Sequence, residues 1–280
     1  MTMFASFDEN GRLARPTWSN TALDEAASPF SNAYLWDKTI EISSNVVVNS
    51  LFMNNSGKNK WLGEKRKLTI TSGGLVLHGS NTAIGQPDRT DNGLLVLGDA
   101  SHPAYVFAKA SNLSSPNQIW ADVTAPGGFV SSYSGALVLG GDQTGIGNEL
   151  VVNAGVLTLG TAEAGCALAK DLPIRICSGA TLGLPRADTV KLNTMWFDGA
   201  AGQFGKIEVQ EGVAAKCKKA YWRNYPETDE WQPILRGVYT GDAATSIAVG
   251  AIYDPDHFAG SGTIEVLRDD SVSPLVIRLR

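Results

Sequence analysis

Four short segments of the chain share one pattern, a glycine that leads into a short apolar run, and this pattern constrains the fold more than any other feature. The four copies begin at Gly73, Gly93, Gly135 and Gly155, and a weaker fifth copy begins at Gly179. The leading glycines are 20, 42, 20 and 24 residues apart, so a unit of about 20 to 24 residues recurs, once across a double gap. A fixed period in this range is typical of repeat arrays whose units stack on one another.

The composition also favours short strands joined by tight turns. The chain has 280 residues with 30 glycines, and only 18% of its residues are charged, against ordinary shares of ~7% glycine and ~25% charged residues. Glycine at each corner supplies the positive φ angle that lets a strand turn sharply. Stacking at the ~4.8 Å strand spacing would pair every backbone group with the turns above and below it. The sequence therefore predicts an all-β parallel β-helix, with a β-sandwich as the main alternative because its short strands recur at similar intervals.

The double copy carries a resemblance to a known family. Residues Ser134–Gly145 contain a Gly-x-Leu-x-Leu-x-Gly strand, and Asn148–Leu159 contain Val-x-x-Gly-x-Leu-x-Leu. Together they resemble the autotransporter-associated (passenger) β-strand repeat, although Asp142-Gln143-Thr144 stands where that family has Asn-x-Thr. The resemblance covers about Thr69–Leu184 and the chain from Gly237 onward. It implies a right-handed parallel β-helix in a secreted or surface-exposed bacterial protein.

Three regions are expected along the chain: an N-terminal cap over residues 1–38, a β-helix over 39–210 with an inserted loop near 100–133, and a C-terminal β-helix end and cap over 211–280. Within them we expect local features at a few places: a helical turn at Thr21–Ala27, one strand near Ile119–Val123 in the inserted loop, a helix at Thr161–Asp171, and a closing strand at Leu275–Leu279.

Candidate chemistry is sparse. Asp254, Asp256 and His257 could ligate a metal, but Asp-Pro-Asp is first a turn composition, so we predict no metal and no cofactor. No phosphate-binding loop or nucleophile elbow occurs. The carboxylates that would serve an enzyme on this fold are Asp99, Asp122 and Asp142, each of which is also ordinary in a turn.

Aromatic residues crowd one stretch, and they are the binding candidates. They are Tyr221, Trp222, Tyr225, Trp231 and Tyr239. Tyrosine and tryptophan combine a broad apolar face with a polar group, which suits stacking on sugars or proteins. The same residues would also serve to plug the end of a solenoid core. Both interpretations stay open, with the plug preferred.

The remaining features concern the binding partners and the cellular location of the protein. The net charge of −5 gives no indication of nucleic-acid binding, so the basic stretch Lys58–Lys67 around Trp61 is expected to be a solvated loop. Cys166 and Cys177 either pair across a short loop or stay free as buried thiols, the second being preferred. Residues 1–5 show no signal peptide, so either the protein stays inside the cell or the leader is absent from this chain. We expect no membrane insertion of this fragment.

These observations lead to one functional hypothesis and one alternative. The hypothesis is a non-enzymatic, secreted or outer-membrane-surface β-solenoid, a passenger-type stalk or adhesive scaffold that binds glycans or host or matrix proteins. The alternative is a carbohydrate-active enzyme, a polysaccharide lyase or glycosidase, on the same fold.

Overall fold

The computed structural model describes residues 6–7, 13–14, 32–36, 40–42, 44–54, 59–62, 66–88, 91–110, 114–185 and 191–268. The expected helical turn at Thr21–Ala27 and the closing strand at Leu275–Leu279 lie outside the described residues, as do most of the N-terminal cap and the side chain of Trp61. The chain divides into two compact units. The first comprises Met1–Glu149 with Cys166–Ala169, and the second comprises Leu150–Gly165 with Lys170–Arg280.

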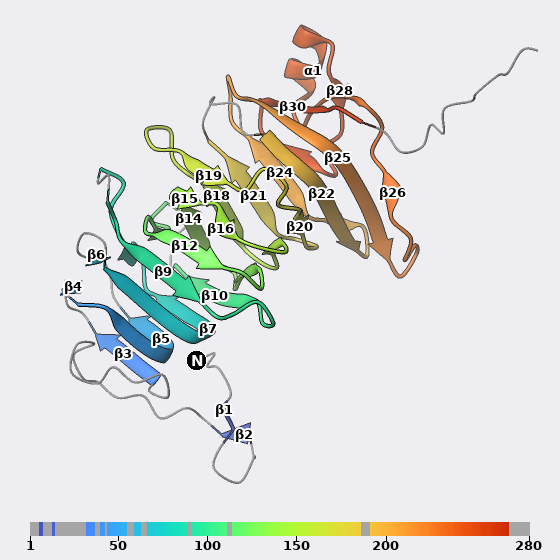
Figure 1. Cartoon of the computed structure of the whole chain (residues 1–280). Coiled ribbons are helices and arrows are strands. Elements are labelled where there is room, and N and C mark those ends of the chain that lie inside the picture. The colour runs from blue at the N-terminus through green and yellow to red at the C-terminus, as the bar shows by residue number, and fades with distance from the viewer. Residues whose placement is uncertain are drawn as a thin grey trace, which may run out of the picture. The chain divides into compact units, whose positions relative to one another are not determined.

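The first unit is built from parallel strands (Figure 1). One group contains β3 (Asn32–Trp36), β5 (Val46–Asn54), β7 (Lys67–His78), β9 (Leu94–Leu97), β10 (Ala104–Lys109), β12 (Asp122–Ala125), β13 (Phe129–Ser132) and β16 (Gly145–Ile146). A second sheet contains β4 (Ile40–Ile42), β6 (Asn59–Leu62), β8 (Ala83–Ile84), β11 (Asn117–Ile119) and β14 (Ala136–Leu139). Two further pairs are parallel β15 (Gly141–Gln143) with β19 (Cys166–Leu168), and antiparallel β1 (Ser6–Phe7) with β2 (Leu13–Ala14).

Strand β7 shows how the chain turns from one sheet face to the next. Its first half pairs with β9, where Lys67 lies opposite Leu94, and its second half pairs with β10, where Gly74 lies opposite Tyr105. Gly73 stands between the two halves with φ of 70°. A residue with a Cβ would adopt this angle at a cost, so glycine sets the corner.

The second unit repeats this parallel arrangement. Its larger group contains β17 (Leu150–Val152), β20 (Ile174–Ile176), β22 (Lys191–Ala200), β25 (Ala214–Tyr225) and β30 (Thr263–Val266). Three shorter strands, β23 (Gln203–Phe204), β26 (Gln232–Pro233) and β27 (Gly237–Thr240), pair antiparallel with β22, β25 and β30, respectively. A fourth, β28 (Ile252–Tyr253), pairs in parallel with β27. Its smaller sheet contains β18 (Val156–Leu159), β21 (Thr181–Leu184), β24 (Lys206–Val209) and β29 (Phe258–Ala259).

The core of the second unit is a column of apolar side chains at matched positions. Leu157 pairs with Leu182, Leu182 with Ile207, and Ile207 with Phe258. All four are at most 2% exposed, and burying each contributes about 1.5–3 kcal/mol of transfer free energy. The alternating burial of the parallel strands therefore places every second residue inside and leaves the others for the surface.

The prediction of an all-β chain with parallel strands is confirmed, and the arrangement is compatible with a β-solenoid. A β-sandwich, which needs antiparallel sheets, is not what these strands form. Gly73, Gly93, Gly155 and Gly179 have φ between 69° and 74°, as corner glycines should. Gly135 has no positive φ angle. Glycine is needed there because the backbone of Ala108 lies so close that a Cβ would be 2.4 Å from its carbonyl oxygen.

Three local predictions were wrong. The stretch Lys58–Lys67 is not a loop throughout, because Asn59–Leu62 form strand β6, which pairs in parallel with β4 and β8. Residues 100–133 do not form an inserted loop with one strand, because β10 to β13 lie there and β10 pairs in parallel with β7 and β13. The loop was expected because Pro103, Pro116 and Pro126 lie in this segment. The segment nevertheless contains an alternating strand in which Ala104, Val106 and Ala108 are buried. Residues 161–171 contain strand β19 instead of a helix.

The helix of the described residues lies elsewhere. It is α1 (Ala243–Val249), between β27 and β28. The Asp242 carboxylate caps it by accepting a hydrogen bond from the Thr245 N–H at 2.7 Å, and Gly250 ends it with φ of 69°. No helix in the described part of the chain is long and apolar enough to cross a membrane. Cys166, Cys177 and Cys217 are all free thiols, so the Cys166–Cys177 pair is not formed.

Candidate functional site

The outward face of β20, β22 and β25 in the second unit carries a row of three large side chains. Arg175 pairs with Trp196, and Trp196 pairs with Tyr221. Each is half-buried. Arg175 and Trp196 stand between buried neighbours on their strands, such as Met195 and Phe197 beside Trp196, and Tyr221 follows the buried Ala220. Because side chains alternate along a strand, this row lies on the side of the sheet opposite the core.

A tryptophan from beyond β25 packs onto this row. The Trp196 and Tyr221 rings stack with centroids 4.5 Å apart, and Trp231 meets Trp196 edge-on at 4.7 Å. The Arg223 guanidinium lies 4.4 Å from the centre of the Trp231 ring, and that of Arg175 lies 6.0 Å away. We call these five residues the outer aromatic cluster. Cation–π contacts of this kind are worth about 0.5–1 kcal/mol at exposed sites.

The two arginines bring positive charge to the cluster, and acidic residues orient one of them. The Arg223 Nε donates to the Asp198 carboxylate at 2.5 Å, and its Nη1 lies 3.4 Å from Asp229. Asp198 lies opposite Arg223 in the β22–β25 register. The outer aromatic cluster therefore combines three partly exposed rings with two guanidinium groups, and acidic side chains hold the Arg223 guanidinium in place.

The other predicted binding residues lie apart from this cluster. Trp222 faces the opposite way and contacts Phe204 and His257, each at 5.8 Å between ring centres. Tyr239 is 5% exposed, stacks on Phe258 and donates its hydroxyl to the Leu235 carbonyl, so it belongs to the core. Tyr225 is exposed at the end of β25. The structure thus brings together Tyr221 and Trp231 of the five, and it adds Trp196, Arg175 and Arg223.

His257 sits in a second aromatic group with Phe197, Phe204, Trp222 and Phe258, which we call the inner aromatic cluster. Its Nδ1 lies 3.0 Å from the Asp254 carboxylate. Burial alone would raise the pKa of Asp254, but hydrogen bonds from the His257 side chain and from nearby backbone N–H groups outweigh it and lower that pKa. Among the described residues, no group of three His, Cys, Asp or Glu side chains is arranged to hold a metal ion.

The carboxylates considered for an enzyme lie in the first unit, where Asp122 and Asp142 are next to each other. Asp99 accepts hydrogen bonds from the Ser101 and His102 N–H groups of its own turn. Asp142 accepts from the Thr144 N–H at 2.9 Å and the Thr144 hydroxyl at 2.6 Å, again within its own turn. Asp122 is adjacent to Asp142 and accepts from its backbone N–H at 3.2 Å. Two of the three carboxylates are therefore committed to local turns.

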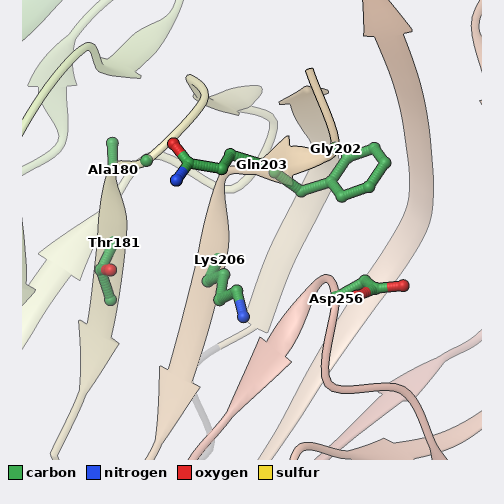
Figure 2. Close-up of a pocket in the computed structure, with 8 residues that line it drawn as sticks. Ala180, Thr181, Gly202, Gln203, Lys206 and Asp256 are labelled. Atoms are coloured by element: carbon green, nitrogen blue, oxygen red, sulfur yellow. The ribbon is translucent and has the colours of Figure 1, made fainter. Parts of the chain in front are cut away.

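A pocket of about 380 Å³ opens elsewhere in the second unit, and sequence reasoning missed it. The residues that line it come from the turn before β21 and its first residue, from the β22–β23 turn with β23, from β24 and from the loop before β29 (Figure 2). They are Gly179, Ala180, Thr181, Gly202, Gln203, Phe204, Lys206 and Asp256. The one signal in the sequence was the run of small residues around Gln203. In the structure Ala201 and Gly202 both have positive φ, 51° and 78°. Such angles at both central residues are those of a tight type I′ hairpin turn.

Compared with known proteins, the chain matches no protein-family model, no curated protein and no solved structure. The resemblance to passenger repeats thus stays a prediction that depends on the residues of the double copy.

Proposed function

We propose that the chain is a right-handed parallel β-helix of the passenger type, secreted or displayed on a bacterial surface. In this proposal it acts as a non-enzymatic stalk and adhesive scaffold, and it binds glycans through the outer aromatic cluster. The observation that carries the proposal is that Trp196, Tyr221 and Trp231 converge on the outer sheet face and all three keep part of their surface exposed.

The chemistry of this cluster suits carbohydrate. Aromatic rings offer flat apolar surfaces on which the C–H faces of a sugar ring stack, and their polar groups bond to hydroxyls. The neighbouring guanidiniums are planar donors suited to oxygen acceptors. A row formed by strands in register presents these groups along a line, which matches an extended oligosaccharide better than a small globular ligand.

The turn carboxylates support a binding role over the enzymatic alternative. Glycoside cleavage needs two carboxyl groups facing each other across the scissile bond. Asp142 and Asp99 instead accept hydrogen bonds from their own turns, and Asp122 bonds to the backbone of Asp142. A polysaccharide panel assayed for new reducing ends or unsaturated products tests this alternative, and turnover abolished by Asp142→Ala would establish it in place of the proposal.

A glycan array tests the binding proposal directly. We expect the wild-type protein to bind at least one class of oligosaccharide and Trp231→Ala to lose that binding. Tyr253→Ala is the matched control, because Tyr253 is an exposed aromatic residue outside the cluster. Circular dichroism checks that Trp231→Ala and Tyr253→Ala are both folded. If Trp231→Ala is folded and binds as well as wild type, the outer aromatic cluster is excluded as the site.

A further inference from the structure

The pocket of Figure 2 shares no residue with the outer aromatic cluster, and its lining has a chemistry of its own. Gly179, Ala180 and Gly202 are small and leave space. Around that space stand one aromatic ring, one amide, one hydroxyl and one ammonium group, from Phe204, Gln203, Thr181 and Lys206. A few convergent polar groups beside an apolar wall are the usual composition of a small-ligand site.

The charge of Lys206 is the most informative part of the pocket. Its Nζ donates one hydrogen bond to the Pro255 carbonyl at 2.7 Å, which leaves two of its three N–H donors. Among the described residues Lys206 has no ion-pair partner. In Figure 2 the Asp256 carboxylate turns away from the Lys206 ammonium group. The pocket therefore offers a positive charge that a ligand can neutralise.

Asp256 limits the kind of anion that fits. Its carboxylate is exposed and lies at the edge of the same pocket. A polyanion would meet that negative charge, whereas a ligand with a single carboxylate directed at Lys206 would avoid it. The amide and hydroxyl groups of Gln203 and Thr181 match neutral hydroxyls on the same ligand.

The walls of the pocket are held in place by packing. The Phe204 ring contacts His257 at 4.7 Å and Trp222 at 5.8 Å, so the inner aromatic cluster fixes it from behind. Gly199 makes this packing possible, because a Cβ there would lie 2.6 Å from the Phe204 ring. The Ser178 hydroxyl donates to the Gln203 carbonyl at 2.7 Å and anchors the turn. A preformed site of this kind binds without a large ordering cost.

We propose that this pocket binds one acidic sugar residue, a pyranose that carries a single carboxylate. The carboxylate bonds to Lys206, the ring hydroxyls bond to Gln203 and Thr181, and the apolar face of the ring lies against Phe204. The choice of a sugar over another carboxylate rests on the proposed function, that the chain binds glycans. The pocket adds a second site and a charge preference to that function.

Isothermal titration calorimetry with a galactose oligomer that ends in a single galacturonic acid residue, and with the neutral galactose oligomer of the same length, tests the proposal. We expect wild type to bind the acidic oligomer more tightly than the neutral one. Lys206→Met should weaken acidic binding about tenfold or more, as expected for loss of a charge-assisted contact, and Lys206→Arg should keep most of it. Lys218→Met, which removes an exposed cation from β25 outside the pocket, should bind as wild type does.

Two further experiments, competition by simple anions and binding by the Trp231→Ala variant, distinguish the pocket proposal from its alternatives. Acetate or inorganic phosphate at the same concentration should not displace the oligomer, and displacement would assign a simple anion site in place of a sugar site. Acidic binding that is unchanged by Lys206→Met but lost in Trp231→Ala would overturn the pocket proposal and leave the proposed function intact. Binding that depends on Lys206 and is untouched by Trp231→Ala would keep the pocket and reject the outer aromatic cluster. No binding of either oligomer would overturn the pocket proposal.

Discussion

Trp196 and Tyr221 are direct partners on the neighbouring parallel strands β22 and β25, and their rings stack at 4.5 Å with planes 16° apart. The pair lies on the outer face of the sheet, where stacking is not enforced by burial in the core. It shows how a parallel register converts a sequence spacing of 25 residues into a side-by-side contact.

A double-mutant cycle on this pair should measure the stacking. Trp196→Ala and Tyr221→Ala should each lower the free energy of unfolding, and the coupling between them should be about 0.5–1.5 kcal/mol. Chemical denaturation of the four proteins provides the values. Trp196 with Tyr253, which makes no ring contact with it among the described residues, should give coupling near zero. A coupling near zero for Trp196 with Tyr221 would mean that the stacking contributes nothing.

Gly140 should tolerate no side chain. A Cβ there would lie 1.9 Å from the Trp120 ring, which is 2% exposed and has no room to move outward. Gly140→Ala should therefore lower the free energy of unfolding by about 1–3 kcal/mol, as overpacking does. Gly165→Ala is the matched control: a Cβ there meets nothing within 4 Å. We expect that variant to be unchanged or slightly more stable, and equal effects of the two substitutions would contradict the packing at Gly140.

Asp122 should make stability depend on pH. Partial burial, together with the charges of Asp142 and Asp91, raises the pKa of Asp122 above its ordinary value. The folded protein then holds this proton more tightly than the unfolded chain, so ionisation of Asp122 costs stability as the pH rises through its folded pKa. Asp122→Asn removes that cost and keeps an oxygen for the Asp142 N–H.

Asp122→Asn should therefore be more stable than wild type near pH 7, and the difference should vanish below about pH 4, where the carboxyl is protonated in both states. Urea denaturation across this pH range measures the difference. Glu208→Gln, which removes an exposed carboxylate from β24, controls for net charge. A difference that persists unchanged at low pH would show that charge is not the cause.

The Cys217 thiol should not react with thiol reagents in the folded protein. Its side chain is fully buried, and burial raises the pKa of its thiol to about 12. With Cys166 and Cys177 replaced by serine, Ellman's reagent at pH 8 should label Cys217 only after denaturant is added. A chain that keeps only the half-buried Cys177 should react in the native state. Rapid native labelling of Cys217 would mean that the strand β25 opens readily.

The sequence predicted the repeated strands well because their physical cause is local. A corner with a positive φ angle favours glycine, and an apolar run favours burial. The residue types of Gly73 and Leu75 therefore predict a corner and a buried position directly. The same reasoning failed for residues 100–133, where three prolines indicated a loop. There the alternation of Ala104, Val106 and Ala108 was the better guide, but alanine is a weak signal of burial.

The candidate sites were harder to predict because they depend on register. Trp196 lies 25 residues before Tyr221, and only the pairing of β22 with β25 places the two rings together. The crowding of aromatic residues led to Tyr221 and Trp231 but also to Tyr239, which turned out to be in the core. The pocket joins Thr181, Gln203 and Asp256 from three turns of the chain, and no local pattern links residues so far apart.

The most direct test of a glycan-binding, non-enzymatic function is the mass of the bound glycan after long contact with the protein. The best ligand from the glycan array is captured by immobilised wild-type protein, held overnight, eluted and analysed by mass spectrometry. We predict that the glycan is retained and returns with its mass unchanged, and that immobilised Trp231→Ala retains much less. A glycan that is not retained, or that returns shortened or unsaturated, would contradict this prediction.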